Sequence, residues 1–326
     1  MKQIFDSLKK QSPSRIIALG FSAVILVGAV LLMMPFSLKK GVHLSFLNAL
    51  FTSTSAVCVT GLVVVDTADS FTAIGQAIVA ALIQIGGLGI ASVGVGFIIA
   101  AGKRVSIKSR LMVKEALNVD TYHGMVRLVR IVLAITLGFE AAGAIISFFV
   151  FRKDYSPLHA VGISIFHSIA AFNNAGFDNL GGMHNLIPYK DNILLNITTD
   201  VLVIVGGIGF LVLVDIVKQK SFKKLCLHSK VAISMTAVLL IGGTLILKAT
   251  ENITWMGAFF QSMTTRTAGF STYNIGNFSK AGLFNVYSYV HRGFARINRW
   301  RCKDYNDICD DSGSKMYGKK KVSTCI

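Results

Sequence analysis

The sequence predicts an all-α polytopic membrane protein built from repeated units, each a span, a re-entrant pore loop and a second span. Hydrophobic residues make up 53% of the 326-residue chain, charged residues 15%, and the mean hydropathy is +0.61. One soluble core of this length needs far less apolar surface. In addition, a short glycine-centred motif recurs three times between apolar runs, as CVTGL, NNAGF and RTAGF. These two observations together predict the fold class.

Five apolar runs are each close to or above the roughly 20 residues that cross a bilayer as a helix. The first run is too long for a signal peptide and lacks a small-residue cleavage site after it, so we interpret it as a span. The five predicted spans cover residues 16–36, 71–101, 126–151, 192–217 and 231–248.

The net charge of +17 is concentrated at the ends of the predicted spans. Lysines and arginines gather before the first span and in segments 103–130 and 218–230. Cytoplasmic loops carry such an excess, so these segments, and the N-terminus, are predicted to lie in the cytoplasm below the cell membrane. This placement favours the lipid bilayer, and not a nucleic acid, as the partner of the basic residues. The loops assigned to the outer side hold acids: Asp66, Asp69, Asp178, Asp191 and Glu251.

Three further apolar segments are predicted not to cross the membrane. These are residues 44–65, 158–177 and 254–270. If one of them crossed, the next basic segment would lie on the outer side and not in the cytoplasm. Each must enter and return on the same side. Backbone that is not helical survives at membrane depth only where protein or a water-filled cavity satisfies its N–H and C=O groups. The three segments are therefore predicted to line an aqueous cavity.

The three re-entrant segments align on the glycines Gly61, Gly176 and Gly269, which makes the chain an internal repeat. IGGLGI and VGGIGF follow the first two segments inside the next spans. No strand precedes these motifs, so they are interpreted as packing or flexibility sites and not as phosphate loops. Each segment has a phenylalanine ten positions before the glycine and a serine between them: Phe51, Phe166 and Phe259, with Ser53, Ser168 and Ser262.

A glycine in each loop is typical of a cation filter. A half-crossing helix points its C-terminal carbonyls at the membrane centre, where about half a negative charge attracts a cation. Glycine permits the turn that follows and a close approach of backbone to an ion. A ring of carbonyls replaces the hydration shell of a monovalent cation, as in potassium filters. The predicted filter residues are Val59, Thr60, Gly61, Leu62, Asn173, Asn174, Ala175, Gly176, Phe177, Thr267, Ala268, Gly269 and Phe270, with the ion at the carbonyls around Thr60, Gly61, Ala175, Gly176, Ala268 and Gly269.

With CVTGL, FNNAGF and TRTAGF after short helices, and GGLG and GGIG in the following spans, residues 16–284 resemble the Trk/Ktr/HKT superfamily of potassium transport subunits, nearest to the Ktr membrane subunits. The resemblance implies four units around one axis, one potassium site at the filter glycines and an intramembrane loop that gates below it. It also implies sodium-promoted potassium uptake by a homodimer that rests on a cytosolic ring of nucleotide-binding regulatory subunits.

The chain departs from the family pattern after the third loop. The predicted units are residues 1–102, 103–217 and an incomplete 218–284, followed by an aberrant tail at 285–326 that is rich in charged residues. Codons for residues 291–310 read one base later permit IGASPGSTGGGAKTTTTFVM, which is similar to a fourth filter of the family. We therefore expect a frameshift near residue 285. Without a fourth loop the chain as written is expected not to transport, and no disulfide or zinc site is inferred from the cysteines of the tail.

Two other functions stay open from the residues alone. A membrane enzyme needs a titratable pair at depth, and the candidates are few: Glu140, Asp200 and His167. We interpret His167 as a packed helix residue and not as a base, and we expect no enzymatic activity. A non-conducting scaffold subunit is the second alternative. Glu140 either binds a cation or pairs with a neighbour, and Arg266 either pairs inside the fold or tunes access to the pore.

Overall fold

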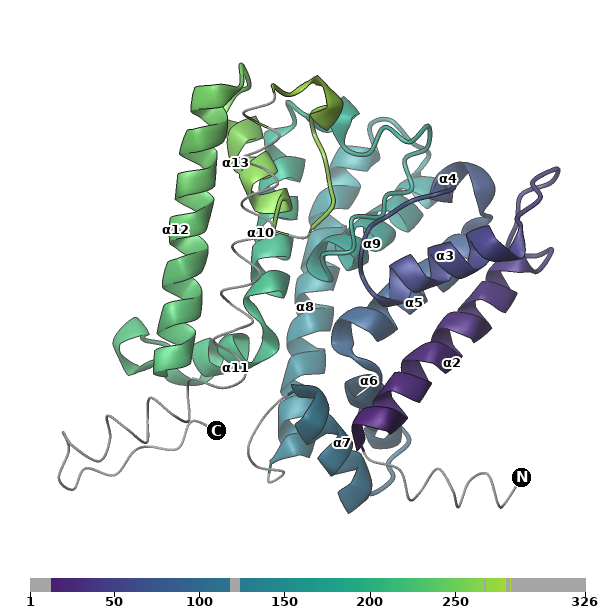
Figure 1. Cartoon of the computed structure of the whole chain (residues 1–326), viewed down its shortest axis with the longest axis vertical. Helices are drawn as coiled ribbons and strands as arrows, with labels where there is room; N and C mark the ends of the chain where they lie inside the picture. The colour runs from purple at the N-terminus through teal and green to yellow at the C-terminus, as the bar shows by residue number, and fades with distance from the viewer. Residues whose placement is uncertain (1–12, 118–123, 267, 280–281, 283–326) are drawn as a thin grey trace. The chain divides into compact units, whose positions relative to one another are not determined.

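The fold is known from a computed structural model, in which residues 13–117, 124–266, 268–279 and 282 are described (Figure 1). The described residues are helical apart from loops and one isolated bridge between Leu38 and Phe71. The chain divides into two compact units. Unit 1 comprises residues 1–210 and 267–273, and unit 2 comprises residues 211–266 and 274–326.

The first repeat in unit 1 begins with α2 (Pro13–Met33), which is apolar along its length. A short helix, α3 (Phe46–Val57), packs against α2 and begins where Ser45 Oγ accepts the amide of Asn48. After the first glycine loop and α4 (Thr67–Ser70), the chain enters α5 (Ala73–Leu88). Helix α6 (Ile90–Ala100) then leaves α5 at an angle of 104°.

The second repeat, also in unit 1, follows the same order. Helix α7 (Ile107–Leu117) precedes α8 (Met125–Phe151), which packs closely on the short helix α9 (Pro157–Phe172). A loop with the short η1 (Ile187–Tyr189) leads to α10 (Ile193–Ile208), which contacts both α8 and α9. Figure 1 shows α8, α9 and α10 side by side.

Unit 2 holds most of the third repeat. Helix α11 (Phe210–Gln219) and η2 (Phe222–Lys224) precede the long apolar helix α12 (Leu227–Thr250). The short helix α13 (Trp255–Thr264) packs along α12, and η3 (Ile275–Asn277) follows. The loop that links α13 to η3 belongs to unit 1 by its contacts.

The polytopic all-α prediction is confirmed, with one correction to the shape of the spans. Helices α2, α8 and α12 are long and apolar enough to cross a membrane. The second and fourth predicted spans are each two helices, broken at Gly89 (φ 78°) and Gly209 (φ 100°). Hydropathy is the same for a straight and a broken run, so the sequence alone predicted single spans. Each glycine loop directly follows one of the short apolar helices α3, α9 and α13.

Candidate functional site

The first glycine loop begins where α3 ends, and its backbone turns tightly. The amide of Cys58 donates to Thr54 O (2.8 Å), and the amide of Thr60 donates back to Ser55 O (3.0 Å). Between them, Val59 adopts a left-handed conformation with φ 55°. A β-branched residue rarely occupies that region, so the turn is held by its surroundings.

The second loop repeats this geometry 115 residues later. The amide of Asn173 donates to Ile169 O (3.1 Å), and the amide of Ala175 donates to Ala170 O (2.8 Å). Asn174 has φ 57°, matching the left-handed residue of the first loop. The sequence repeat is therefore a repeat of backbone geometry as well.

The three predicted filter glycines lie against one another's loops in unit 1. Gly61, Gly176 and Gly269 have φ of 74°, 67° and 80°. A Cβ built on Gly61 would lie 2.7 Å from Ala175 O, and one on Gly176 would lie 2.7 Å from the Cα of Gly269 and 2.8 Å from Ala268 O. Only glycine fits both the conformation and the spacing. Three loops from distant parts of the sequence thus approach at their glycines.

Two hydrogen bonds and one aromatic contact hold the third loop in unit 1. The amide of Leu186 donates to Ser271 O, and the amide of Ser271 donates to Asn185 Oδ1, both at 3.1 Å. The ring of Phe270 packs edge-on against His167, with 5.4 Å between centroids. Asn185 was not predicted from the sequence, because nothing in its local pattern points to a partner 86 residues away. The predicted filter residue Thr267 lies outside the described residues.

The apolar residues after the three glycines differ in their surroundings. Phe177 and Phe270 are buried at 0% and 1% exposure, whereas Leu62 is 61% exposed. The second and third loops are thus covered on a side where the first is open.

The three serines anchor the short helices to the long ones. In unit 1, Ser53 Oγ donates to Ile25 O and Ser168 Oγ donates to Glu140 O, each at 2.7 Å. In unit 2, Ser262 Oγ donates to a carbonyl of α12, that of Leu240, at 3.0 Å. Each serine therefore fixes the helix that leads into a loop to the neighbouring long helix.

The acids that follow the first two glycines bind backbone amides. Asp66 Oδ1 caps α4, and Asp66 Oδ2 accepts the amide of Met183 at 2.7 Å. Asp69 accepts the amide of Gly182 at 3.0 Å, so the two loops are joined beyond the glycines. Asp178 lies just after the second loop, where burial raises its pKa to about 6. Nearby Asp66 raises this pKa further, while His184 and backbone amides lower it.

Glu140 and His167, two polar residues inside apolar helices of unit 1, have protein partners. Glu140 bonds to Gln84 and Asn173, a site the sequence hinted at only through a lone glutamine in an apolar span. His167 Nε2 lies 2.9 Å from Thr199 Oγ1, and that hydroxyl donates to Leu195 O, so His167 is the donor.

Two other charged residues differ in whether their side chains find hydrogen-bond partners. In unit 2, Arg266 donates to Thr236 Oγ1 at 3.0 Å, as the pairing interpretation expected. In unit 1, Asp200 is 6% exposed, and its Oδ1 has no hydrogen-bond partner among the residues that the structure describes. Within that part of the chain, no three His, Cys, Asp or Glu side chains gather as a metal site.

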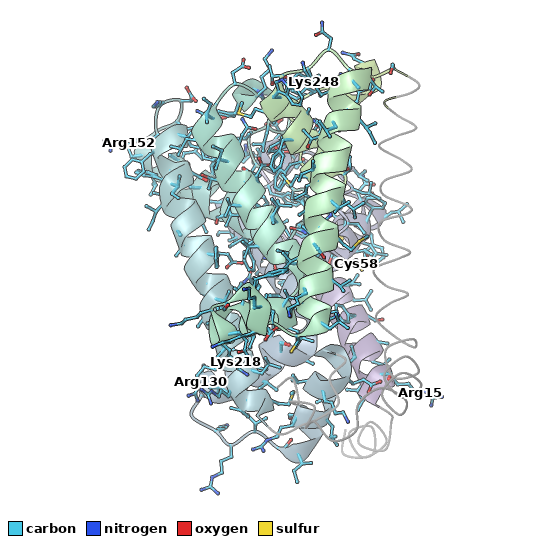
Figure 2. The ribbon with its side chains drawn as sticks, turned by 90° about the vertical axis from the view of Figure 1, so that its left-hand side faces the viewer. Arg15, Cys58, Arg130, Arg152, Lys218 and Lys248 are labelled. Carbon is cyan, nitrogen blue, oxygen red and sulfur yellow. The ribbon has the colours of Figure 1, made fainter. Side chains whose placement is uncertain are left out.

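The basic residues mark the ends of unit 1. Figure 2 shows Arg15 and Arg130 near one end, Arg152 at the other, and Cys58 between them. Ser14 Oγ donates to Glu115 at 2.9 Å, which brings the start of α2 to the basic segment around α7. The two basic segments of unit 1 therefore share one end, and the first glycine loop begins at intermediate depth.

A family model described as "Cation transport protein", named TrkH, matches residues 10–236, more than half of the chain. The chain belongs to the TrkH family. The family description names cation transport, and the apolar helices of this chain fit a polytopic membrane protein.

Two curated members of the Ktr branch are each 39% identical to this TrkH-family chain. They are the "Potassium/sodium uptake protein NtpJ" of Enterococcus hirae, over 84% of this chain and 63% of the relative, and the "Ktr system potassium uptake protein B" of Bacillus subtilis, over 82% and 62%. The chain thus spans less than two thirds of these relatives. The fold is similar to the crystal structure of the potassium transporter TrkH from Vibrio parahaemolyticus, with a TM-score of 0.66, 17% identity and coverage of 96% of this chain and 66% of that one.

Proposed function

We propose that this TrkH-family chain is the pore-forming subunit of a potassium uptake system of the cell membrane. The observation that carries the proposal is the approach of Gly61, Gly176 and Gly269, each with a positive φ and each against the backbone of a neighbouring loop. Backbones this close leave carbonyl oxygens as the ion ligands that the loops can offer. The predicted filter residues in the three loops line the ion path.

Potassium is the proposed ion, with sodium as a second transported or promoting ion. The loops carry no carboxylate, and a divalent ion would require hard acidic ligands. The names of the two Ktr relatives, one for potassium uptake and one for potassium and sodium uptake, support this choice.

The proposed assembly is a homodimer in the bilayer, with the N-terminus in the cytoplasm and a cytosolic ring of nucleotide-binding subunits below. The shared end of the basic segments in unit 1 supports this orientation under the positive-inside rule. The predicted repeat boundaries at residues 102, 217 and 284 belong to the same proposal.

A fourth wall is proposed to complete the filter. The first loop presents an exposed apolar edge, with Leu62 61%, Val63 41% and Val64 43% exposed, which such a wall would cover. The tail in which the shifted codons permit IGASPGSTGGG lies outside the described residues. Accordingly, the 326-residue chain as written is expected not to conduct, and the chain with the shifted reading from residue 285 is expected to conduct.

Potassium flux in liposomes tests the proposal. Both versions of the chain are reconstituted, and uptake of rubidium, as a potassium tracer, is compared with that of sodium. We expect flux only from the shifted version, and Gly176→Ser in it should lower the preference for potassium at least tenfold. An unchanged preference would reject the filter assignment. Absence of flux from both versions would favour the non-conducting scaffold alternative.

A further inference from the structure

Three polar side chains from three separate elements meet at the end of the second pore helix, inside unit 1. Gln84 lies on α5, Glu140 on α8, and Asn173 is the first residue after α9. Gln84 Nε2 donates to Glu140 Oε2 at 3.1 Å, and Asn173 Nδ2 donates to Gln84 Oε1 at 2.8 Å and to Glu140 Oε1 at 3.2 Å. The three side chains close a ring in which both carboxylate oxygens are used.

Asn173 is held on both sides of its amide. Its Nδ2 also lies 2.9 Å from Ile169 O, so three oxygens surround one amide nitrogen that has two hydrogens to give. Its Oδ1 lies against Gly87, where a Cβ would overlap it. The second glycine of the GGLG motif therefore makes room for the Asn173 side chain.

The first repeat shows that a pore loop of this shape forms without such a ring. Ile25 accepts the anchoring serine bond with its carbonyl, as Glu140 does in the second repeat, but its side chain has no hydrogen-bonding group. Cys58 stands at the position of Asn173, and the backbone hydrogen bonds of the two loops are the same. A carboxylate at 6% exposure in an apolar helix is costly, and the backbone turn does not require it.

We propose that Glu140 is a positioning residue for the second filter loop. Acting through Asn173, it fixes the backbone of residues 174–176, which includes the left-handed Asn174 and Gly176. Gln84 completes the ring from α5 of the first repeat. The consequence for ion discrimination rests on the proposed function; the consequence for the backbone does not.

The first test is hydrogen–deuterium exchange of the full chain in detergent, read at the amides of Asn174 and Ala175. Those amides donate to Ala171 O and Ala170 O, so their exchange reports opening of the loop. Glu140→Ile copies the first repeat, and we expect exchange at both amides to be at least tenfold faster. Exchange at the matching amides of the first loop should stay unchanged.

Glu140→Gln is a second variant that keeps the size of the side chain. An NH2 group replaces one of the two carboxylate oxygens, Oε1 or Oε2, that accept from Asn173 and Gln84, so one of these hydrogen bonds is lost and an acceleration of roughly threefold is expected. Ser168→Ala is the matched control, because it removes a hydrogen bond to Glu140 O and leaves the ring intact. Acceleration in both loops alike, or none in the second, would overturn the proposal.

A double-variant cycle separates action through Asn173 from general loosening of the fold. Asn173→Cys installs the residue of the first repeat. If Glu140 acts through Asn173, adding Glu140→Ile to Asn173→Cys should accelerate exchange by less than twofold beyond the single change. Independent, multiplicative effects would contradict the proposed route.

Ion discrimination is read in the chain with the shifted reading from residue 285, with and without Glu140→Ile, as the slowing of exchange at residues 174–176 by potassium chloride relative to sodium chloride. We expect a preference for potassium in the chain without the substitution and at least a fivefold smaller one in Glu140→Ile. A preserved preference would overturn the role of Glu140 in selection. Lack of preference in the chain without the substitution, together with loosening in Glu140→Ile, would reject the proposed function and support the positioning of the loop.

Discussion

The first and second glycine loops of unit 1 share a backbone and differ in what surrounds it. Both have a left-handed residue two positions before the glycine, the same pair of returning amides and the same serine anchor. The first loop is exposed at Leu62, whereas the matching Phe177 has no exposed surface. The backbone shape thus comes from the local sequence, and the two loops differ in that Gly176 lies against the third loop as well as beside the first.

Replacing the glycines should give the largest contrast between the loops. Gly176→Ala places a methyl group 2.7 Å from the Cα of Gly269 in a loop whose next residue, Phe177, is buried, whereas Gly61→Ala places one 2.7 Å from Ala175 O in a loop whose next residue, Leu62, is 61% exposed. We expect a loss of about 2 to 5 kcal/mol in the free energy of unfolding for Gly176→Ala, from the positive φ and the overlap together, and a smaller loss for Gly61→Ala. Thermal unfolding in detergent measures both.

Gly41→Ala is the matched control that measures the cost of a positive φ without any close contact. Gly41 has φ 83° with nothing within 4 Å of a Cβ, so its substitution should cost only about 1 to 2 kcal/mol. Equal losses at Gly41 and Gly176 would mean that the close approach of the second and third loops contributes nothing.

Asp178 should make only the second loop sensitive to pH, because Val63 stands at the matching position of the first. Burial raises the pKa of Asp178 from 3.8 to about 6, so the folded state binds the proton more tightly than the unfolded state. The stability that depends on protonated Asp178 is therefore fully present below about pH 4 and is lost as the pH rises through about 6. At pH 8 the loss is at most about 3 kcal/mol.

Asp178→Asn keeps an oxygen for the amide of Leu180 and removes the titration. The variant should melt at a higher temperature than the unchanged chain at pH 8 and at the same temperature at pH 4. Asp66 and His184, which also face Asp178, remain in both proteins. A melting-temperature difference that does not vary between these pH values would contradict the assignment.

Removing the serine hydrogen bonds should give the smallest loss in the free energy of unfolding, and the loss should be nearly the same in the two repeats. Ser53→Ala and Ser168→Ala each remove one hydrogen bond of 2.7 Å to a carbonyl of a long helix. Hydrogen bonds between helices in a membrane contribute on average about 0.6 kcal/mol, so we expect two similar losses of this order in thermal unfolding. A much larger loss at Ser168 would show that the second repeat is rigid throughout and not only around Asn173.

The sequence predicted most of what depends on local pattern. Long apolar runs gave the spans, and the recurring glycine located three loops whose positive φ angles require that residue. The breaks at Gly89 and Gly209 were not predicted, because the packing that bends a helix has no signature in its hydropathy. The partners of Glu140 lie 56 and 33 residues away, and one sequence carries no sign of which polar side chains meet.

The contacts of the third loop set an order for biosynthesis. Residues 1–210 leave the ribosome before Phe270 and Ser271, which nonetheless pack with His167 and Leu186 of that earlier segment. At 5 to 20 residues per second, translation of the roughly 60 intervening residues takes about 3 to 12 s. Throughout this interval the contacts that His167 and Leu186 make with Phe270 and Ser271 cannot form.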